Sequence, residues 1–142
     1  MSIAKVLAPV TGGQRDHGVL ASAIAAARPF DAHVMAYFVR PDLGETLAFF
    51  TDGVSGLVVD EVVKATRDAG DEAAIRVQTT IASVCAEFGI EFVAQPVRAN
   101  RVTISLREES GSFGDRLTAA ARLSDLVVFP PIREGDQAGL PA

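Results

Sequence analysis

The first candidate for a binding site is Thr11-Gly12-Gly13, a turn directly after an apolar run. Backbone N–H groups of such a turn, placed before a helix, can converge on phosphate oxygens. Asp16 follows, and it has two readings: contact with a ribose, or the N-cap of the next helix. Because the sequence contains neither glycine-rich motif of dinucleotide or P-loop sites, a plain tight turn is the competing reading.

Further charged residues stand near the ends of predicted strands. Arg40 and Arg98 would each either bind a phosphate or carboxylate or simply face solvent. Arg107-Glu108-Glu109 brings together two carboxylates of the kind that general acid–base catalysis uses. No nucleophile or metal motif accompanies them, so we expect a solvated strand end and no catalytic residues.

Two histidines and one cysteine leave little material for a zinc site or a cysteine–histidine catalytic pair. His17 lies near the predicted start of a helix, where it would reach a ligand or face solvent. His33 opens a strand and is expected to be structural, and Cys85 lies on an apolar helical stripe as an inert thiol. We therefore expect neither a metal site nor an enzyme.

The composition bounds the class of protein. The chain has 142 residues, of which 49% are hydrophobic and 22% charged, and it suits one globular domain. Its net charge of -5 argues against a nucleic-acid partner, and one cysteine points to a reducing compartment. No signal peptide or membrane-spanning run is found, so we expect a cytoplasmic protein without a membrane partner.

Apolar periodicity predicts alternating strands and helices. Helix 55–88 is expected to kink or break at Gly70, and strand 102–106 alternates in the manner of an exposed or edge strand. We read 43–53 as an ordered loop. The expected strands are 3–10, 33–39, 91–97, 102–106 and 126–129, and the expected helices are 16–28, 55–88 and one beginning at a capping box over 112–115.

This alternation predicts an α/β fold, a doubly wound and mostly parallel sheet with helices on both faces. Such sheets bind ligands at the carboxyl ends of their strands. The expected domain covers residues 1–131, and residues 132–142 are expected to be a tail or a truncated linker.

Three segments carry a resemblance to a known family: Lys5–Thr11, Met35–Pro41 and Ala121–Phe129, with a further exposed stretch at Ile104–Gly111. In this order they resemble the universal stress protein family over about residues 3–132. The resemblance implies an adenine-nucleotide alpha-hydrolase-like fold with strand order 3-2-1-4-5, in a cytoplasmic, usually dimeric protein of the stress response. Many members bind ATP through an aspartate after the first strand, an apolar residue ending the second, and a glycine-rich stretch after the fourth.

The sequence departs from that pattern at each point. Thr11 stands in place of the aspartate, Phe38 in place of a smaller valine, and Pro130 and Arg133 in place of two glycines. Proline has no N–H to offer a phosphate. The distal glycine–serine pair is absent and the fifth strand is expected to be missing, which would leave the fourth strand as an exposed edge.

By this resemblance the candidate cofactor site comprises residues at three strand ends. Its ligand would be ATP or AMP, although the resemblance does not require that the protein bind either one. Its members are Pro9, Val10, Thr11, Gly12, Phe38, Phe129 and Pro130. An exposed edge invites a second chain, so we expect a homodimer or a second similar domain. An end at Gly139–Ala142 would fit the first half of a tandem protein.

Three functions compete. The first is a non-catalytic, self-associating stress-protein-like domain whose adenine-nucleotide binding is weak or lost. The alternative is a true ATP- or AMP-binding member, or a slow ATP hydrolase, whose site a second domain or chain completes. The third, an adenylating or flavoprotein-like domain, would need a phosphate loop that the sequence does not contain.

Overall fold

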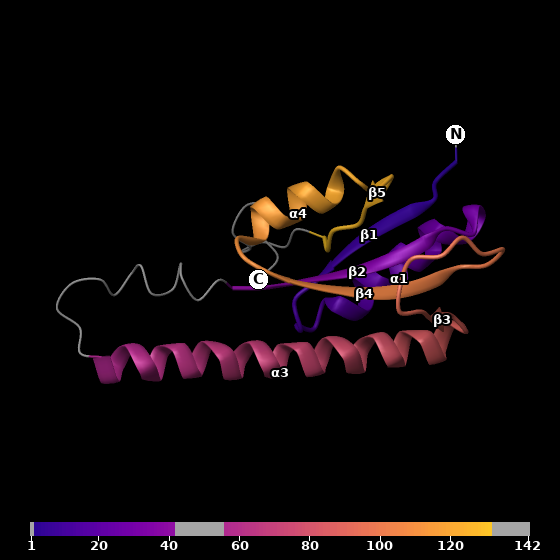
Figure 1. Cartoon of the computed structure of the whole chain (residues 1–142). Helices are drawn as coiled ribbons and strands as arrows, with labels where there is room; N and C mark the ends of the chain where they lie inside the picture. Colours follow the sequence, from indigo (N-terminus) through magenta and orange to yellow (C-terminus); the bar gives the residue numbers. More distant parts are fainter. Residues whose placement is uncertain (1, 42–55, 132–142) are drawn as a thin grey trace.

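The computed structural model describes residues 2–41 and 56–131 (Figure 1). The predicted loop 43–53 and the predicted tail 132–142 lie outside the described residues. In chain order the elements are β1 (Lys5–Val10), α1 (Asp16–Ala27), the 3-10 helix η1 (Arg28–Phe30), β2 (His33–Arg40), α3 (Gly56–Phe88), β3 (Glu91–Phe92), β4 (Thr103–Ser110), α4 (Phe113–Ala121) and β5 (Leu126–Val127).

The strands form one sheet in the order β3-β4-β2-β1-β5, and every pairing is parallel. In register, Val10 of β1 lies beside Phe38 of β2. Helices α1 and α3 cover one face and α4 covers the other (Figure 1), which confirms the predicted α/β class. The expectation that a fifth strand is missing is wrong, because the sheet has five strands when β3 is included.

Strand β4 is not the edge that its alternating pattern predicted. It lies between β3 and β2, and its residues Thr103 and Ser105 are buried. The His33 ring is hydrogen-bonded to the hydroxyls of both, at 2.8 Å and 2.7 Å, and is itself 5% exposed. Buried polar atoms need such partners. Thr103 and Ser105 therefore lie in a hydrogen-bonded interior, and not on a solvent-facing side of the sheet.

Strand β3 is shorter than the predicted strand 91–97. Only Glu91 and Phe92 pair with β4, and one more hydrogen bond runs from the Val93 N–H to the Ile104 carbonyl. Pro96 follows soon after and has no N–H for a sheet ladder. The edge strand therefore ends early.

Helix α3 is continuous through Gly70, so of the kink or break expected there the break is wrong. Gly70 lies under the Arg40 side chain, where an added Cβ would sit 3.5 Å from a guanidinium nitrogen. The ion pair between Arg40 and Asp71 joins the helix to β2 at this level. The buried residues of α3 all lie in its second half, and its first half runs past the carboxyl ends of the strands (Figure 1). No described helix is long and apolar enough to cross a membrane.

Candidate functional site

The candidate site lies where β1 and β2 end. Val10 and Phe38 are neighbours across the two strands and are 1% and 4% exposed. Both belong to the core that α1 and α3 cover, so this floor of the site is buried and apolar. Thr11 follows at the surface, and Pro130 approaches it from the segment after β5.

Two hollows flank this floor. The first, of about 570 Å³, is lined by Thr11, Gly13, Arg15 and Pro130 among others, between the start of α1 and the end of the described chain. The second, of about 620 Å³, lies between the sheet and α3. Its lining is mostly apolar and includes Val10, Thr11, Phe38, Val62, Ala73 and Phe113.

The structure therefore brings together four of the seven predicted site residues. Thr11 and Pro130 line the first hollow, and Val10, Thr11 and Phe38 line the second. Pro9, Gly12 and Phe129 line neither. The Phe129 side chain is 54% exposed, so phenylalanine does not fill the site from that side.

Gly12 packs against α3 and takes no part in either hollow. Its φ is +82°, a left-handed backbone that favours glycine, and an added Cβ would lie 2.8 Å from the Ala73 carbonyl oxygen. The Arg76 guanidinium donates to the Gly12 carbonyl at 2.8 Å. Sequence reasoning missed Ala73 and Arg76, because only the packing of α3 against this turn gives them a role.

Asp16 closes the same turn from the other side. Its carboxylate accepts hydrogen bonds from the backbone N–H groups of Thr11, at 2.9 Å, and Gly12, at 2.7 Å, and the residue is 2% exposed. The predicted N-cap role is wrong: Arg15 holds the N-cap position, and Asp16 is the first residue of α1. Burial raises the pKa of Asp16, and the two N–H groups and the Arg76 charge oppose that rise.

Asp16→Asn is expected to lower the free energy of unfolding by about 1–2 kcal/mol. An amide keeps one acceptor oxygen but turns its NH₂ group toward the second backbone N–H, which leaves that donor unpaired. Urea unfolding at pH 7 measures the change. Asp31→Asn, on an exposed residue, is the matched control and should leave the midpoint unchanged. Equal stability of Asp16→Asn and the wild type would contradict this role of the carboxylate.

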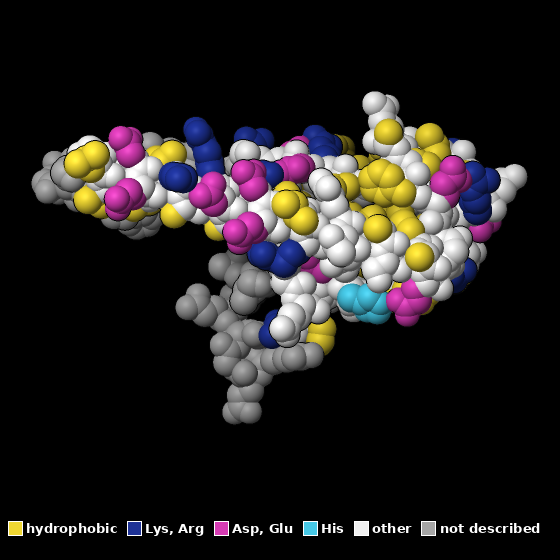
Figure 2. Space-filling model, turned by 90° about the horizontal axis from the view of Figure 1, so that it is seen from below, with side chains coloured by type: hydrophobic (Ala, Val, Ile, Leu, Met, Phe, Trp, Pro, Cys, Tyr) yellow, Lys and Arg dark blue, Asp and Glu magenta, His cyan; other side chains and the backbone are white. Residues whose placement is uncertain are grey.

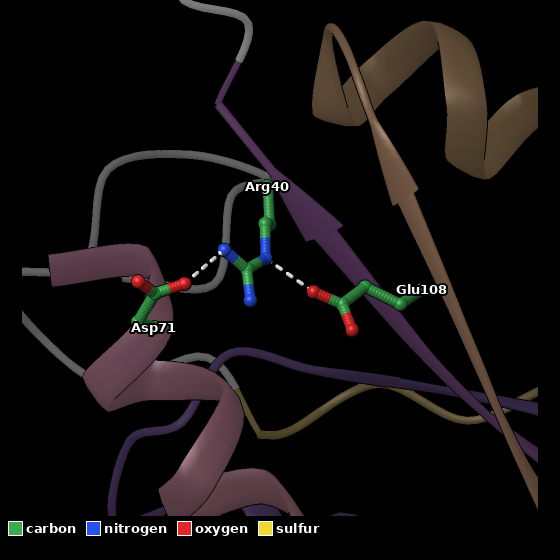
Figure 3. Close-up of polar contacts among 3 residues, drawn as sticks. All are labelled: Arg40, Asp71 and Glu108. Atoms are coloured by element: carbon green, nitrogen blue, oxygen red, sulfur yellow. Dashed lines mark hydrogen bonds and ion pairs between the residues drawn. The ribbon is translucent and has the colours of Figure 1, made fainter. Parts of the chain in front are cut away.

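Arg40 is held by two carboxylates (Figure 3). It does not line either of the two hollows. Its guanidinium donates to Asp71 of α3 at 2.7 Å and to Glu108 of β4. It thus ties the helix to the sheet, and the two carboxylates that already balance its charge weaken its attraction for a further anion, the role that the sequence predicted as one alternative. Arg98 is exposed, lies beyond the short β3, and lines neither hollow.

The carboxylates of Glu108 and Glu109 cannot act as a pair, because neighbouring residues of a strand point to opposite faces of the sheet. Glu108 binds Arg40, while Glu109 binds Arg107 at 2.6 Å and accepts a hydrogen bond from the Tyr37 hydroxyl. Burial and this hydrogen bond raise the pKa of Tyr37 to about 12. The same bond lowers the pKa of Glu109. These residues therefore form structural contacts across the sheet.

The remaining candidates are peripheral. The exposed His17 ring lies 2.7 Å from a Glu87 carboxylate oxygen, which links α1 to α3. Cys85 packs partly buried against the core, and burial raises the pKa of its thiol, in keeping with an inert group. In the part of the chain that the structure describes, no three His, Cys, Asp or Glu residues are placed to hold a metal ion.

Comparison with known proteins identifies the fold. No family model and no curated protein matches the sequence. Among solved structures, the universal stress protein UspA from Lactobacillus plantarum matches with a TM-score of 0.53 and 14% sequence identity. The match covers 99% of this chain and 85% of that one. With the two-residue β3 set aside, the order β4-β2-β1-β5 follows the first four positions that the resemblance implied. The chain therefore has the fold of a universal stress protein.

Proposed function

We propose that this universal-stress-protein-like domain is non-catalytic, works in the cytoplasm through self-association, and binds adenine nucleotides weakly or not at all. The observation that carries the proposal is the Asp16 carboxylate. It accepts hydrogen bonds from the N–H groups of Thr11 and Gly12, the donors that a phosphate at this turn would need. A protein anion therefore occupies the anion-binding position.

The opposite wall of the first hollow supports the same proposal. It is formed by Pro130 and Pro131, neither of which has a backbone N–H. This wall therefore offers no backbone donor to a phosphate in the hollow, and on this side the loss of the phosphate's hydration would not be compensated. The absence of catalysis is supported by Glu108 and Glu109, whose carboxylates are bound to arginines on opposite faces of the sheet.

The second hollow supports one competing function, a true ATP- or AMP-binding domain. Its volume of about 620 Å³ and its apolar lining suit a planar base. Under this second proposal another chain or domain supplies the phosphate donors that this turn does not offer. ATP or AMP is then a ligand of the assembled protein.

Thermal unfolding in the presence of millimolar ATP or AMP distinguishes the two. We expect a shift of the midpoint below about 1 °C, because a ligand stabilises only in proportion to its occupancy of the folded state. A saturable rise of several degrees would favour the second function. In that case Ala65→Phe, which fills the second hollow, should abolish the rise, and Ala86→Phe, on the exposed side of α3, should preserve it.

A further inference from the structure

The turn between β1 and α1, residues 11–15, holds two backbone donors against a single carboxylate. Oδ1 of Asp16 accepts the N–H of Thr11 at 2.9 Å, and Oδ2 accepts the N–H of Gly12 at 2.7 Å. Successive N–H groups of a turn form a concavity that binds anions. Each oxygen of the side chain thus meets its own donor, as the two oxygens of a bound carboxylate ion would.

Positive charge surrounds this carboxylate. The Arg76 guanidinium of α3 donates to the Gly12 carbonyl at 2.8 Å. Burial raises the pKa of Asp16, while the Thr11 and Gly12 N–H groups and then the Arg76 charge oppose that rise. Helix α1 also begins at Asp16, and the start of a helix carries partial positive charge. The donors and these charges therefore favour an anion at one point.

The space around the carboxylate is closed. Asp16 is 2% exposed, and Gly12 is buried against α3, where an added Cβ would lie 2.8 Å from the Ala73 carbonyl oxygen. Buried donors need an acceptor. If the carboxylate were removed, the Thr11 and Gly12 N–H groups would therefore face a vacant space of the size of one small anion.

We infer that this turn is an anion-binding site that the chain fills with its own Asp16 carboxylate, and that Asp16 thereby excludes anions from solution. A group tethered so close to its partners has an effective concentration of about millimolar or higher, which a free anion must exceed. The emptied site would take a small carboxylate ion. The inference deepens the proposed function and rests on it, since it names the residue that keeps ligand anions from the turn.

Two truncations of Asp16 leave spaces of different size. Asp16→Ala removes the carboxylate alone, which matches formate, and Asp16→Gly removes the carboxymethyl group, which matches acetate. We expect both variants to melt below the wild type at pH 7. Formate at about 100 mM should raise the midpoint of Asp16→Ala by several degrees, and acetate should do so for Asp16→Gly. Acetate should stabilise Asp16→Ala less than formate does, because its methyl group meets the retained Cβ.

Three controls isolate the turn. Formamide has the shape of formate without its charge and should stabilise Asp16→Ala less, and sodium chloride at equal ionic strength accounts for screening. Asp115→Ala removes an exposed carboxylate from the first turn of α4 and should respond to formate no more than the wild type. Charges of both signs are interspersed along α3 (Figure 2), and the net charge of the chain is -5. General attraction of anions therefore does not account for a response confined to Asp16 variants.

Backbone amide resonances give a second and local measurement. In ¹⁵N-labelled Asp16→Ala, formate should shift the Thr11 and Gly12 amide resonances with the same saturation as the melting midpoint. In the wild type the same two resonances should stay in place, because the Asp16 carboxylate already accepts both N–H groups. If Asp16 served only to stabilise the start of α1, formate would move neither resonance in the variant.

The possible failures are distinct. If neither truncated variant responds to formate or acetate, the inference is overturned, while the weak nucleotide binding proposed for the wild type stands. Formate that shifts the wild-type amide resonances as strongly as those of Asp16→Ala would show that Asp16 excludes nothing. If Asp16→Ala is unfolded in buffer, formate should raise its folded fraction, and a fraction that does not rise also overturns the inference. A strong wild-type response to ATP would overturn the proposed function and leave the formate test intact.

Discussion

Gly12→Ala is expected to lower the free energy of unfolding by about 3 kcal/mol, or roughly 10 °C in the melting temperature. Two costs add. The backbone at φ +82° strains any residue with a Cβ, and that Cβ would lie within 2.9 Å of Ala73 backbone atoms in α3. Because the contact is with backbone, the turn or the helix must move. Urea unfolding at pH 7 measures the loss.

Two other glycines separate these costs. Gly89→Ala meets the strain alone, since φ is +65° and no atom lies within 4 Å of the added Cβ, so about 1 kcal/mol is expected. Gly13→Ala stays in the same turn but meets only the Thr11 hydroxyl at 3.2 Å, and its φ is not in the left-handed region. A loss for Gly12→Ala no larger than that for Gly89→Ala would show that the turn does not rest closely on α3.

The second large effect is a loss of stability in mild acid through His33. Burial, and then the Lys5 charge, lower the pKa of His33 from 6.5 to about 4. The unfolded chain therefore binds a proton first as the pH falls, and the native state is penalised between these two values. Linkage gives a loss of about 2 kcal/mol by pH 5 and about 3 kcal/mol by pH 4. Urea unfolding at pH 7 and pH 5 measures it.

His33→Gln is the informative variant. It keeps a donor and an acceptor near Thr103 and Ser105 but cannot titrate, so its stability should change far less between pH 7 and 5. His17→Gln, which leaves the His33 ring in place, should retain the wild-type loss. Asp16 works in the opposite direction, since its raised pKa favours the native state in acid. A wild-type pH dependence that survives in His33→Gln would assign the loss to other groups.

If both effects are observed, the contacts around the candidate site are structural. Asp16 and Gly12 would then hold the turn after β1 against α3, and the His33 ring would hold β2 to β4. The site would owe its shape to these contacts, and its capacity for ligands would depend on the two hollows alone.

The class of fold and most of its elements can be predicted from the order of residues alone. The apolar runs at β1 and β2, and the helical spacing of apolar residues from Asp16 onward, predict the alternation of strands and helices that the structure shows. They do so because strands and helices each place their buried residues at a characteristic repeat along the sequence. The absence of a glycine-rich phosphate-binding motif can also be recognised from the sequence, because such motifs are short runs of neighbouring residues.

Which polar residues lie in the interior depends on contacts between distant segments, and it became visible only in the folded chain. Thr103 and Ser105 alternate like a solvent-facing strand, yet the His33 ring, 70 and 72 residues away in sequence, makes them buried partners. Asp16 looked like a helix cap until its carboxylate was seen to bind the turn behind it. Gly70 was expected to kink or break its helix, yet α3 continues through it beneath the Arg40 side chain. Hydrogen bonds and packing between distant segments leave no periodic trace in the chain, and this is why they could not be read from it.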